Sequence, residues 1–376
     1  MFGKLGFTAF GGPSAHLALM KSECVERRGW LSAEEFMDRV GVANLVPGPS
    51  STEVAMHLGF LRAGVPGLLA AGICFVLPAA ILATLCGAAY VLWGTQPWVK
   101  GVLVGVKPVV VAIVAGAILQ LAGPAVSSWP KRAVLAGALL MAILGVHEAV
   151  VLLSAGAILV LLSVRADNRK SSFQDLTAFG ASVLAISVAV MALTSLLRLP
   201  THPTNWALFA YFLQIGAVIY GSGYVLIAFL ERGLVGATHW LSKSQLLDAI
   251  AVGQFTPGPV FTTASFIGFL LGGVVGAVVS TIGIFLPAFL FVRVSARSAV
   301  KFRSTPASGW FLDGVNSAAV ALMLLAVFRI ASDAVAGPIS ITFFMISAGV
   351  LMKFKRSAPW LILLGGSAGV LVNRGI

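Results

Sequence analysis

Apolar stretches with few or no charged residues, each about as long as a membrane-spanning helix, dominate this sequence. The clearest are residues 66–92, 101–123, 175–197, 269–292 and 311–331. A helix needs roughly 20 apolar residues to cross a bilayer, and in lipid only helices and closed barrels satisfy their own backbone groups. Because 59% of the residues are hydrophobic and only 10% are charged, the chain cannot cover itself with polar groups in water. The sequence therefore predicts an all-α, multi-pass protein of the cell inner (plasma) membrane.

A longer apolar stretch, residues 133–164, does not fit a single span. As one helix it would be about 48 Å long at 1.5 Å per residue, well beyond the roughly 30 Å of a bilayer core. His147 and Glu148 lie in its middle, so we expect a hairpin of two short helices. Residues 336–352 and 358–375 form the corresponding pair near the C-terminus.

The polar residues exclude several classes of function. Lys and Arg number 25 against 13 Asp and Glu, but the basic residues stand in short runs between apolar stretches. This arrangement is typical of membrane-protein loops, so we expect no nucleic-acid partner. The three cysteines and five histidines show no ligand spacing, so we expect no metal and no cofactor. No nucleotide-binding motif and no complete catalytic motif is present, so we expect neither an enzyme nor an ATP-driven pump.

The sequence repeats itself with an offset of 210 residues, which becomes 209 after a one-residue deletion. Pro47-Gly48-Pro49 matches Pro257-Gly258-Pro259, and Leu77-Pro78-Ala79 matches Leu286-Pro287-Ala288. Further matches pair Gly6 with Gly216, Trp30-Leu31-Ser32 with Trp240-Leu241-Ser242, and Asp38 with Asp248. We therefore divide the chain into two homologous halves, residues 1–198 and 199–376.

The basic residues also predict how the halves are oriented. The loop at 93–100 carries one Lys, whereas the corresponding loop at 293–303 carries four basic residues. Loops with such different positive charge are expected on opposite sides of the membrane, which makes the halves inverted repeats, a common plan in transporters. The count of crossings agrees if each Pro-Gly-Pro segment, and each glycine-rich segment near the start of a half, enters the membrane and returns to the same side. We therefore expect an inverted topology with broken or re-entrant helices at the Pro-Gly-Pro motifs.

The two Pro-Gly-Pro triplets are the first candidate site. Proline lacks an N–H and clashes with the preceding turn, so no continuous helix passes through either triplet. Each triplet should open a half-helix, whose free N–H groups and positive dipole end attract anions. The candidate anion ligands are Pro47, Gly48, Pro49, Ser50, Ser51 and Thr52 in the first half and Pro257, Gly258, Pro259, Thr262 and Thr263 in the second. The alternative is a structural kink that is capped by Ser and Thr.

Two further features add candidate substrate-binding residues. Gly11 and Gly12, with the matching Gly221-Ser222-Gly223, either present N–H groups to a ligand or allow close helix packing. Lys107 follows an apolar run and either neutralises a bound anion or extends to the membrane surface.

Glu53 and His57 lie four residues apart, on one face of the first half-helix. Ionisable groups at membrane depth are candidates for proton relays, so we assign them to proton coupling. The alternative is that a neighbouring group satisfies each of them.

Four motifs resemble the chromate ion transporter (CHR) family in its long, two-domain form. They are Phe10-Gly-Gly-Pro-Ser-Ala-His16, Arg27-Arg-Gly-Trp30, Leu45-Val-Pro-Gly-Pro-Ser-Ser-Thr52 and Phe75-Val-Leu-Pro78. The second half carries degenerate versions, Gln254-Phe-Thr-Pro-Gly-Pro259 and Phe285-Leu-Pro287. The resemblance extends over essentially the whole chain.

The resemblance implies a secondary transporter, an antiporter that exports chromate, uses the proton gradient and confers chromate resistance. It also implies that His16, Asn44 and Gln254 contribute to the substrate site. The family pattern has Gln where this chain has Glu53 and Asn44, so uptake or exchange of sulfate or another oxyanion stays open, as does a remoter role as a membrane-embedded enzyme or scaffold. The expected partners are the oxyanion, protons and the lipid bilayer, and a homodimer is also left open.

Overall fold

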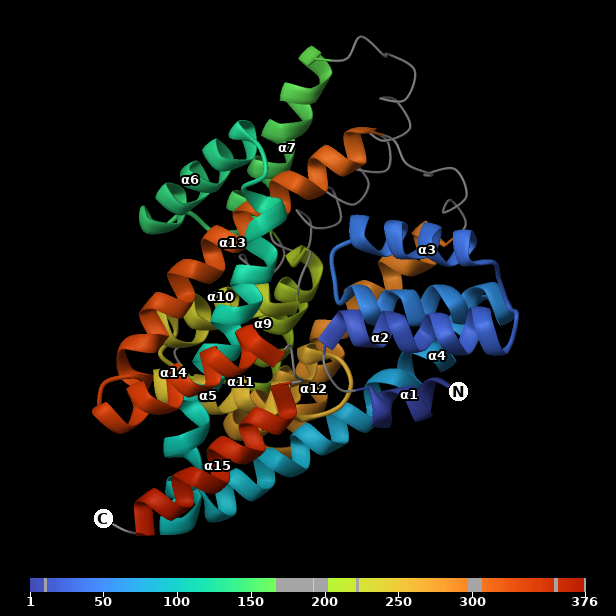
Figure 1. Ribbon diagram of the computed structural model, residues 1–376. Helices are drawn as coiled ribbons and strands as arrows, with labels where there is room; N and C mark the ends of the chain where they lie inside the picture. Colours follow the sequence, from blue (N-terminus) through green and yellow to red (C-terminus); the bar gives the residue numbers. More distant parts are fainter. Residues whose placement is uncertain are drawn as a thin grey trace.

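The computed structural model describes residues 1–9, 12–166, 192, 202–220, 223–296, 306–354 and 358–374, and every regular element in these ranges is helical (Figure 1). The expected span at 175–197 and most of the loop at 293–303 lie outside the described residues. The first half contains α1 (Phe2–Thr8), α2 (Gly12–Lys21), the π-helical η1 (Ser22–Arg27), α3 (Ala33–Leu45), α4 (Ser50–Trp93), α5 (Pro97–Ala125), α6 (Trp129–Ile143) and α7 (Glu148–Ala166).

The described second half repeats this order. It contains α9 (Asn205–Val218), the 3-10 helix η2 (Gly223–Val225), α10 (Leu226–Leu230), the π-helical η3 (Glu231–Ala237), α11 (Lys243–Phe255), the 3-10 helix η4 (Val260–Thr262), α12 (Thr263–Ser295), α13 (Pro306–Ala334), α14 (Pro338–Phe354) and α15 (Ala358–Arg374). Helices α5 and α13 begin and end 209 residues apart, since 306 − 97 and 334 − 125 are both 209. The repeat therefore extends well past the matches visible in the sequence.

The starts of α3 and α11 show how the repeated sequence produces repeated structure. Ser32 caps α3 by accepting from the Glu35 N–H, while the Glu35 carboxylate accepts from the Ser32 N–H. Ser242 and Gln245 form the same capping box at α11. Such boxes satisfy N–H groups that the first helical turn leaves without partners, so both helices begin at the same repeat position.

The expected helix breaks and hairpin are present. Helix α3 ends at Leu45 and α4 begins at Ser50, so the first Pro-Gly-Pro triplet separates two helices. Helices α6 and α7 divide the long apolar stretch near His147, which confirms the predicted pair of short helices.

Helices α4 and α12 each contain a sharp turn, whose residues the sequence analysis did not specify. Ala63 and Gly64 have non-helical backbone angles in α4, as do Gly272 and Gly273 in α12. Each half therefore has a short half-helix after its triplet, a turn, and then a long helix. The two arms of α4 approach so closely that a Cβ on Gly59 would overlap the carbonyl oxygen of Gly67.

The outer faces of α4 and α12 are apolar and exposed. The side chains that recur every fourth residue are all at least 36% exposed: Leu69, Ile73, Leu77, Ile81 and Leu85 on α4, and Val278, Ile282, Leu286, Leu290 and Val294 on α12. Together with α5 and α13, these helices are long and apolar enough to cross a membrane. Continuous exposed apolar stripes are unfavourable in water and favourable against lipid.

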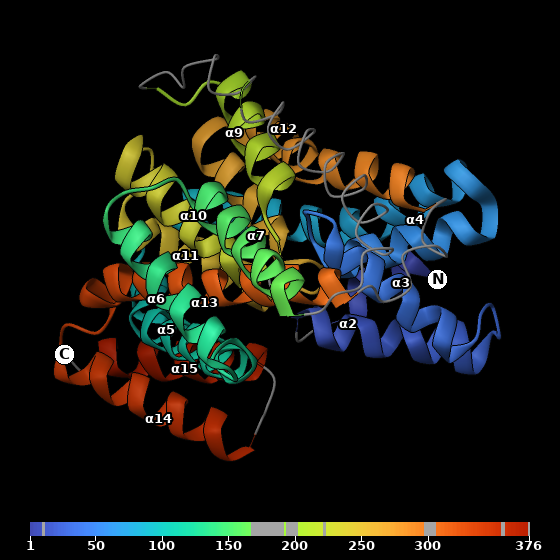
Figure 2. The same ribbon diagram turned by 90° about the horizontal axis from the view of Figure 1, so that it is seen from above.

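The halves do not form separate lobes. Helices α4 and α12 pack on each other, while α5 packs on α14 and α15, and α6 and α7 pack on α13. In Figures 1 and 2, α1–α3 lie at one end of the molecule, and α6 and α14 lie toward the other end. Helices of both halves therefore pack together at the second end, and the contact of α4 with α12 continues the interface between the halves.

Candidate functional site

The two Pro-Gly-Pro loops are each held by the opposite half. In the first loop (Pro47–Pro49), the Gly48 N–H donates to the carbonyl of Ile219 at 2.7 Å. In the second loop (Pro257–Pro259), the Gly258 N–H donates to the carbonyl of Ala9 at 3.0 Å. Both the donors and the acceptors are 210 residues apart, so one contact is the repeat image of the other. The loops therefore lie at the interface between the halves.

Glycine is required at the centre of both loops. Gly48 has φ of 139° and Gly258 has φ of 94°, values that side chains with a Cβ rarely adopt. A Cβ on Gly48 would lie 3.4 Å from the Cβ of Ala288, and one on Gly258 would lie 2.7 Å from the Cβ of Ala79. Each loop thus packs against the long helix of the opposite half, at repeat-related alanines.

His16 links the two loops through hydrogen bonds. Its Nε2 lies 3.1 Å from the Ala9 carbonyl, which also accepts from Gly258, and its Nδ1 lies 3.1 Å from the Ser51 hydroxyl. Since a carbonyl can only accept, Nε2 carries a proton, and in the neutral ring Nδ1 accepts from Ser51.

Glu53 and Thr52, in the first turn of α4, are completely buried without partners. Both carboxyl oxygens of Glu53 and the hydroxyl of Thr52 have no hydrogen-bond partner among the described residues. The carboxyl group lies directly against Gly48, where an added Cβ would overlap Oε1. A buried polar group without a partner costs free energy, so this point of the interface is specialised for something other than packing.

The equivalent turn in the second half is satisfied internally. The Thr262 hydroxyl donates to the Pro259 carbonyl at 2.8 Å, and the Thr263 hydroxyl donates to the Val260 carbonyl at 2.7 Å. Thr263 occupies the repeat position of Glu53. Only the first half therefore has an unpartnered acidic group beside its loop.

His57 does not bond to Glu53, although both lie on one helix. Its Nε2 lies 3.4 Å from the hydroxyl of Ser295 on α12, and its Nδ1 has no partner among the described residues. Both side chains are fully buried. His57 therefore contacts the opposite half, away from the Glu53 carboxyl group.

The remaining candidates lie on other elements: Gln254 on α11, Asn44 on α3 and Gly12 on α2. Gln254 is buried, with its Oε1 accepting from the Tyr224 hydroxyl at 3.4 Å. Asn44 is half-buried near the end of α3, and Gly12 begins α2 with φ of 78°. Gly11 lies outside the described residues.

Lys107 is neutralised elsewhere. Its ammonium group lies 3.5 Å from Asp248 Oδ1 and donates to the Ser244 hydroxyl at 2.5 Å. The other Asp248 oxygen accepts from the Tyr90 hydroxyl at 2.9 Å. Because Asp248 already balances its charge, Lys107 is not placed as a free cation for an anion at the loops.

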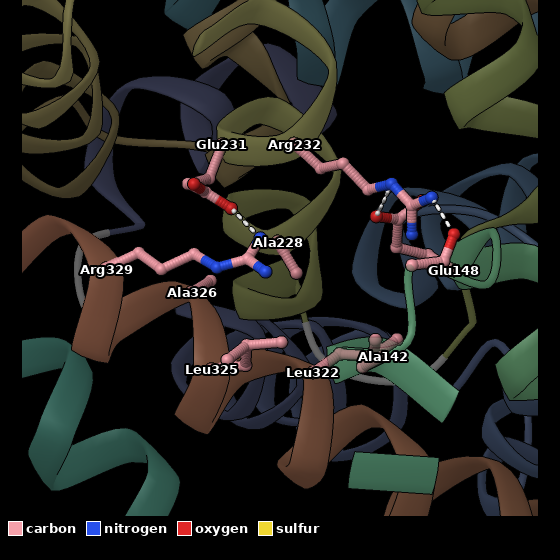
Figure 3. Close-up of a pocket in the computed structure, with 10 residues that line it drawn as sticks. Ala142, Glu148, Ala228, Glu231, Arg232, Leu322, Leu325, Ala326 and Arg329 are labelled. Carbon is pink, nitrogen blue, oxygen red and sulfur yellow. Dashed lines mark hydrogen bonds and ion pairs between the residues drawn. The ribbon is translucent and has the colours of Figure 1, made fainter. Parts of the chain in front are cut away.

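Sequence reasoning missed one cluster of charged side chains. Glu148, Glu231, Arg232 and Arg329 surround a cavity at the junction of α6, α7, α10, η3 and α13 (Figure 3). Charged residues at the edges of apolar helices were a visible signal. The sequence did not show that they come together, because they lie in three separate segments.

Comparisons with known proteins agree with the repeated architecture. A family model described as chromate transporter matches residues 1–162 and 206–370. The chain is 31% identical over 372 residues to the chromate transport protein of Cupriavidus metallidurans, covering 97% of this chain and 90% of that protein. It is 33% identical over 385 residues to the probable chromate transport protein of Synechococcus elongatus, covering 98% and 93%.

A third relative, the chromate transport protein of Pseudomonas aeruginosa, is 29% identical over 389 residues, covering 100% of this chain and 92% of that protein. No solved structure matches the chain. The family match covers both halves, the relatives match nearly end to end, and the helices have the length and polarity of membrane spans. This integral membrane protein therefore belongs to the chromate transporter family.

Proposed function

We propose that this protein exports chromate across the cell inner membrane and that the anion binds between the two Pro-Gly-Pro loops. The observation that carries the proposal is the buried, unpartnered first turn of α4, where Thr52 and Glu53 lie beside a loop held by the opposite half. The family relatives are named for chromate transport. A binding point between two halves suits a transporter, because movement of one half against the other can change its access.

The proposed ligands are groups that donate hydrogen bonds. Thr52 contributes its unpartnered hydroxyl group, and the start of α4 contributes the positive end of its dipole. The proton of the Ser51 hydroxyl is committed to His16, so Ser51 lines the site without donating to the anion. His16 positions the Ser51 hydroxyl through their 3.1 Å contact. In the second half, Thr262 and Thr263 have their hydroxyl protons committed to carbonyls, so we assign them to supporting the loop.

Glu53 is the proposed proton-coupling residue. An ionised carboxylate in this buried place without a partner would cost several kcal/mol, a cost that protonation removes. It would also repel a bound dianion: one unit-charge pair at 4 Å interacts by about 4 kcal/mol at an effective dielectric near 20. Protonation of Glu53 and binding of the anion therefore favour each other. His57, which faces Ser295, is proposed to pass the proton through rearrangement of its side chain.

The membrane potential acts on the charge of the exported anion, in addition to any coupling to protons. An inside-negative potential favours the exit of anions by about 2.3 kcal/mol per charge per 100 mV. A dianion that leaves with one proton still carries net negative charge outward, so the potential favours its export, whereas a pH gradient that is alkaline inside opposes it. Antiport instead requires that the proton and the anion compete, for example if protonated Glu53 donates to a group that the anion must displace.

We also propose that the halves, residues 1–198 and 199–376, are inverted in the membrane. The different basic charge of the loops at 93–100 and 293–303 supports this arrangement. In this arrangement α3, the first Pro-Gly-Pro loop and the first arm of α4 form a re-entrant hairpin, as do α11, the second loop and the first arm of α12. The turns at Gly64 and Gly273 support it, because each returns the chain after a short arm.

Transport into everted membrane vesicles tests the function. Labelled chromate should accumulate in vesicles that contain the protein and not in vesicles that lack it. Nigericin, which removes the pH gradient, and valinomycin with potassium, which removes the potential, separate the two driving forces. Slower uptake with nigericin supports antiport, and faster uptake supports movement with the proton. Uptake of sulfate without chromate would contradict the proposed substrate, and uptake of neither anion would contradict the function.

A further inference from the structure

A small cavity lies among two arginine–carboxylate pairs, away from the Pro-Gly-Pro loops. Its volume is about 100 Å³, and Glu148, Glu231, Arg232 and Arg329 line it (Figure 3). That is several times the space that one water molecule needs. It is well below the roughly 300–1,000 Å³ of pockets that hold drug-sized molecules. The cavity therefore suits waters or a small polyatomic ion.

The two arginines are bound very differently. Arg232 pairs with Glu148 at 3.2 Å and also donates to the carbonyls of Gly145 and Val146. Its guanidinium group is thus committed to fastening η3 to the connection between α6 and α7. Within the described part of the chain, the Arg329 side chain makes a single hydrogen bond, to Glu231 Oε2 at 3.2 Å. Since a guanidinium group has five N–H donors, Arg329 retains donors toward the cavity.

The carboxylates lie deeper than the arginines. The Glu231 side chain is 8% exposed, whereas that of Arg329 is 40% exposed. The rest of the wall is mainly apolar and lacks further charge: Ala142, Ala228, Leu322, Leu325 and Ala326. An ion that enters the cavity therefore meets a guanidinium group first, with a buried carboxylate behind it.

We propose that this cavity is a second oxyanion site, at which a tetrahedral dianion of the chromate and sulfate class binds Arg329 in competition with Glu231. A guanidinium fork matches two oxygens of an oxyanion as well as it matches a carboxylate. Binding exchanges one oxygen partner for another and leaves Arg232 and Glu148 paired. The identity of the anion rests on the proposed function, whereas the place of binding rests on the cavity and its two unequal arginines.

Equilibrium dialysis of the purified full-length protein against labelled chromate tests the proposal. If the anion competes with Glu231 for Arg329, removing Glu231 and removing Arg329 should change the Kd for chromate in opposite directions. Glu231→Gln removes the competing charge and should lower the Kd of the weaker class of binding about tenfold. Arg329→Gln removes the donor and should raise that Kd at least tenfold. A purely structural ion pair predicts instead that both variants, which break the same pair, change binding in the same direction or not at all.

Asp313→Asn is the matched control. Like Glu231→Gln, it replaces an acid by its amide, but on α13. It removes the ion pair between Lys131 and Asp313, which are 2.8 Å apart, and neither residue lines the cavity. It should leave both classes of binding unchanged. If Arg329→Gln does not fold, Arg329→Lys replaces it. Lysine keeps the positive charge without the two-pronged guanidinium group, so the Kd should rise less. Glu231→Gln alone still shows whether removing the carboxylate tightens or weakens chromate binding.

The possible outcomes separate this site from the proposed function. Opposite shifts in the two variants support the second site. Chromate binding by the wild type that neither variant changes, or that both weaken equally, overturns the second site and leaves the transport proposal intact. A wild type that binds no chromate at all contradicts the proposed function, and the second site with it.

Discussion

The two Pro-Gly-Pro loops have the same backbone arrangement and different chemistry. Each central glycine donates to the opposite half and packs against a repeat-related alanine, Ala288 for the first loop and Ala79 for the second. Around the first loop lie His16, Ser51 and Glu53, whereas the positions 210 residues later are Leu226, Phe261 and Thr263. The ionisable groups are therefore confined to one of two equivalent places.

This difference separates what holds the halves together from what handles the ligand. The backbone contacts are duplicated, so both loops are needed to form the interface. The unpartnered carboxyl group and its neighbouring hydroxyl occur once. We infer that the second loop supports the structure and that the first loop carries the proton chemistry.

The largest expected effect follows from substituting the central glycines. Gly258→Ala adds a methyl group to a residue with φ of 94°, which side chains with a Cβ rarely adopt. The new methyl group would also lie 2.7 Å from the Cβ of Ala79, which is fixed to the α4 backbone. Strain and overpacking together should cost roughly 2–5 kcal/mol. We expect little folded protein by size-exclusion chromatography in detergent.

Gly48→Ala provides the comparison at the first loop. Its added methyl group overlaps mainly the mobile end of Glu53 and lies 3.4 Å from the Cβ of Ala288. Combining Gly48→Ala with Glu53→Ala should therefore recover part of the lost folded protein. For Gly258→Ala, only Ala79→Gly should give such a recovery, because the clash is with the Ala79 Cβ. Equal rescue at both loops would contradict the proposed difference in packing.

An intermediate effect is expected at His16. His16→Ala leaves the Ser51 hydroxyl without its partner, while Ala9 keeps its contact with Gly258. Loss of this buried hydrogen bond should cost about 1–3 kcal/mol. In a double-mutant cycle of thermal unfolding, His16→Ala and Ser51→Ala should be coupled, because they remove the same bond. Additive losses would show that the two side chains act independently.

The smallest effect is expected in the second half. Thr263→Val keeps the shape of the side chain and removes the 2.7 Å hydrogen bond to Val260. We expect a loss of about 1 kcal/mol in stability and no change in the pH dependence of chromate transport. A shifted pH profile in vesicles carrying this variant would place proton chemistry at both loops.

Much of the helical arrangement could be predicted from the sequence. The apolar stretches predicted the long helices, and the matching triplets predicted the helix breaks. His147 and Glu148 predicted the hairpin. Each of these signals is local in the sequence. The place of the turn at Gly273 was missed because Gly272-Gly273 lies within the continuous apolar stretch 269–292, and glycine alone does not distinguish a turn from a helix. At Gly64 a signal was visible, because Arg62 and Pro66 flank the turn.

The site was less predictable, because it depends on contacts between distant segments. Lys107 was placed near an anion, but Asp248 neutralises it, and no pattern links these two positions. His57 and Glu53 share a helical face, yet packing directs His57 to Ser295 of the other half. Similarly, the contact of Glu231 with Arg329 joins segments 98 residues apart. Local spacing therefore predicted the two loops and their helix breaks but not the partners of the side chains around them.

The pH profile of Glu53→Gln shows whether Glu53 couples chromate transport to protons. Initial rates of chromate uptake should be measured in everted vesicles from about pH 5.5 to 8.5 for the wild type, Glu53→Gln and Thr263→Val. We predict that Glu53→Gln still transports chromate but with a nearly flat profile, because an amide cannot ionise, while Thr263→Val keeps the wild-type profile. A Glu53→Gln variant that transports with an unchanged profile would show that Glu53 is structural and that proton coupling lies elsewhere.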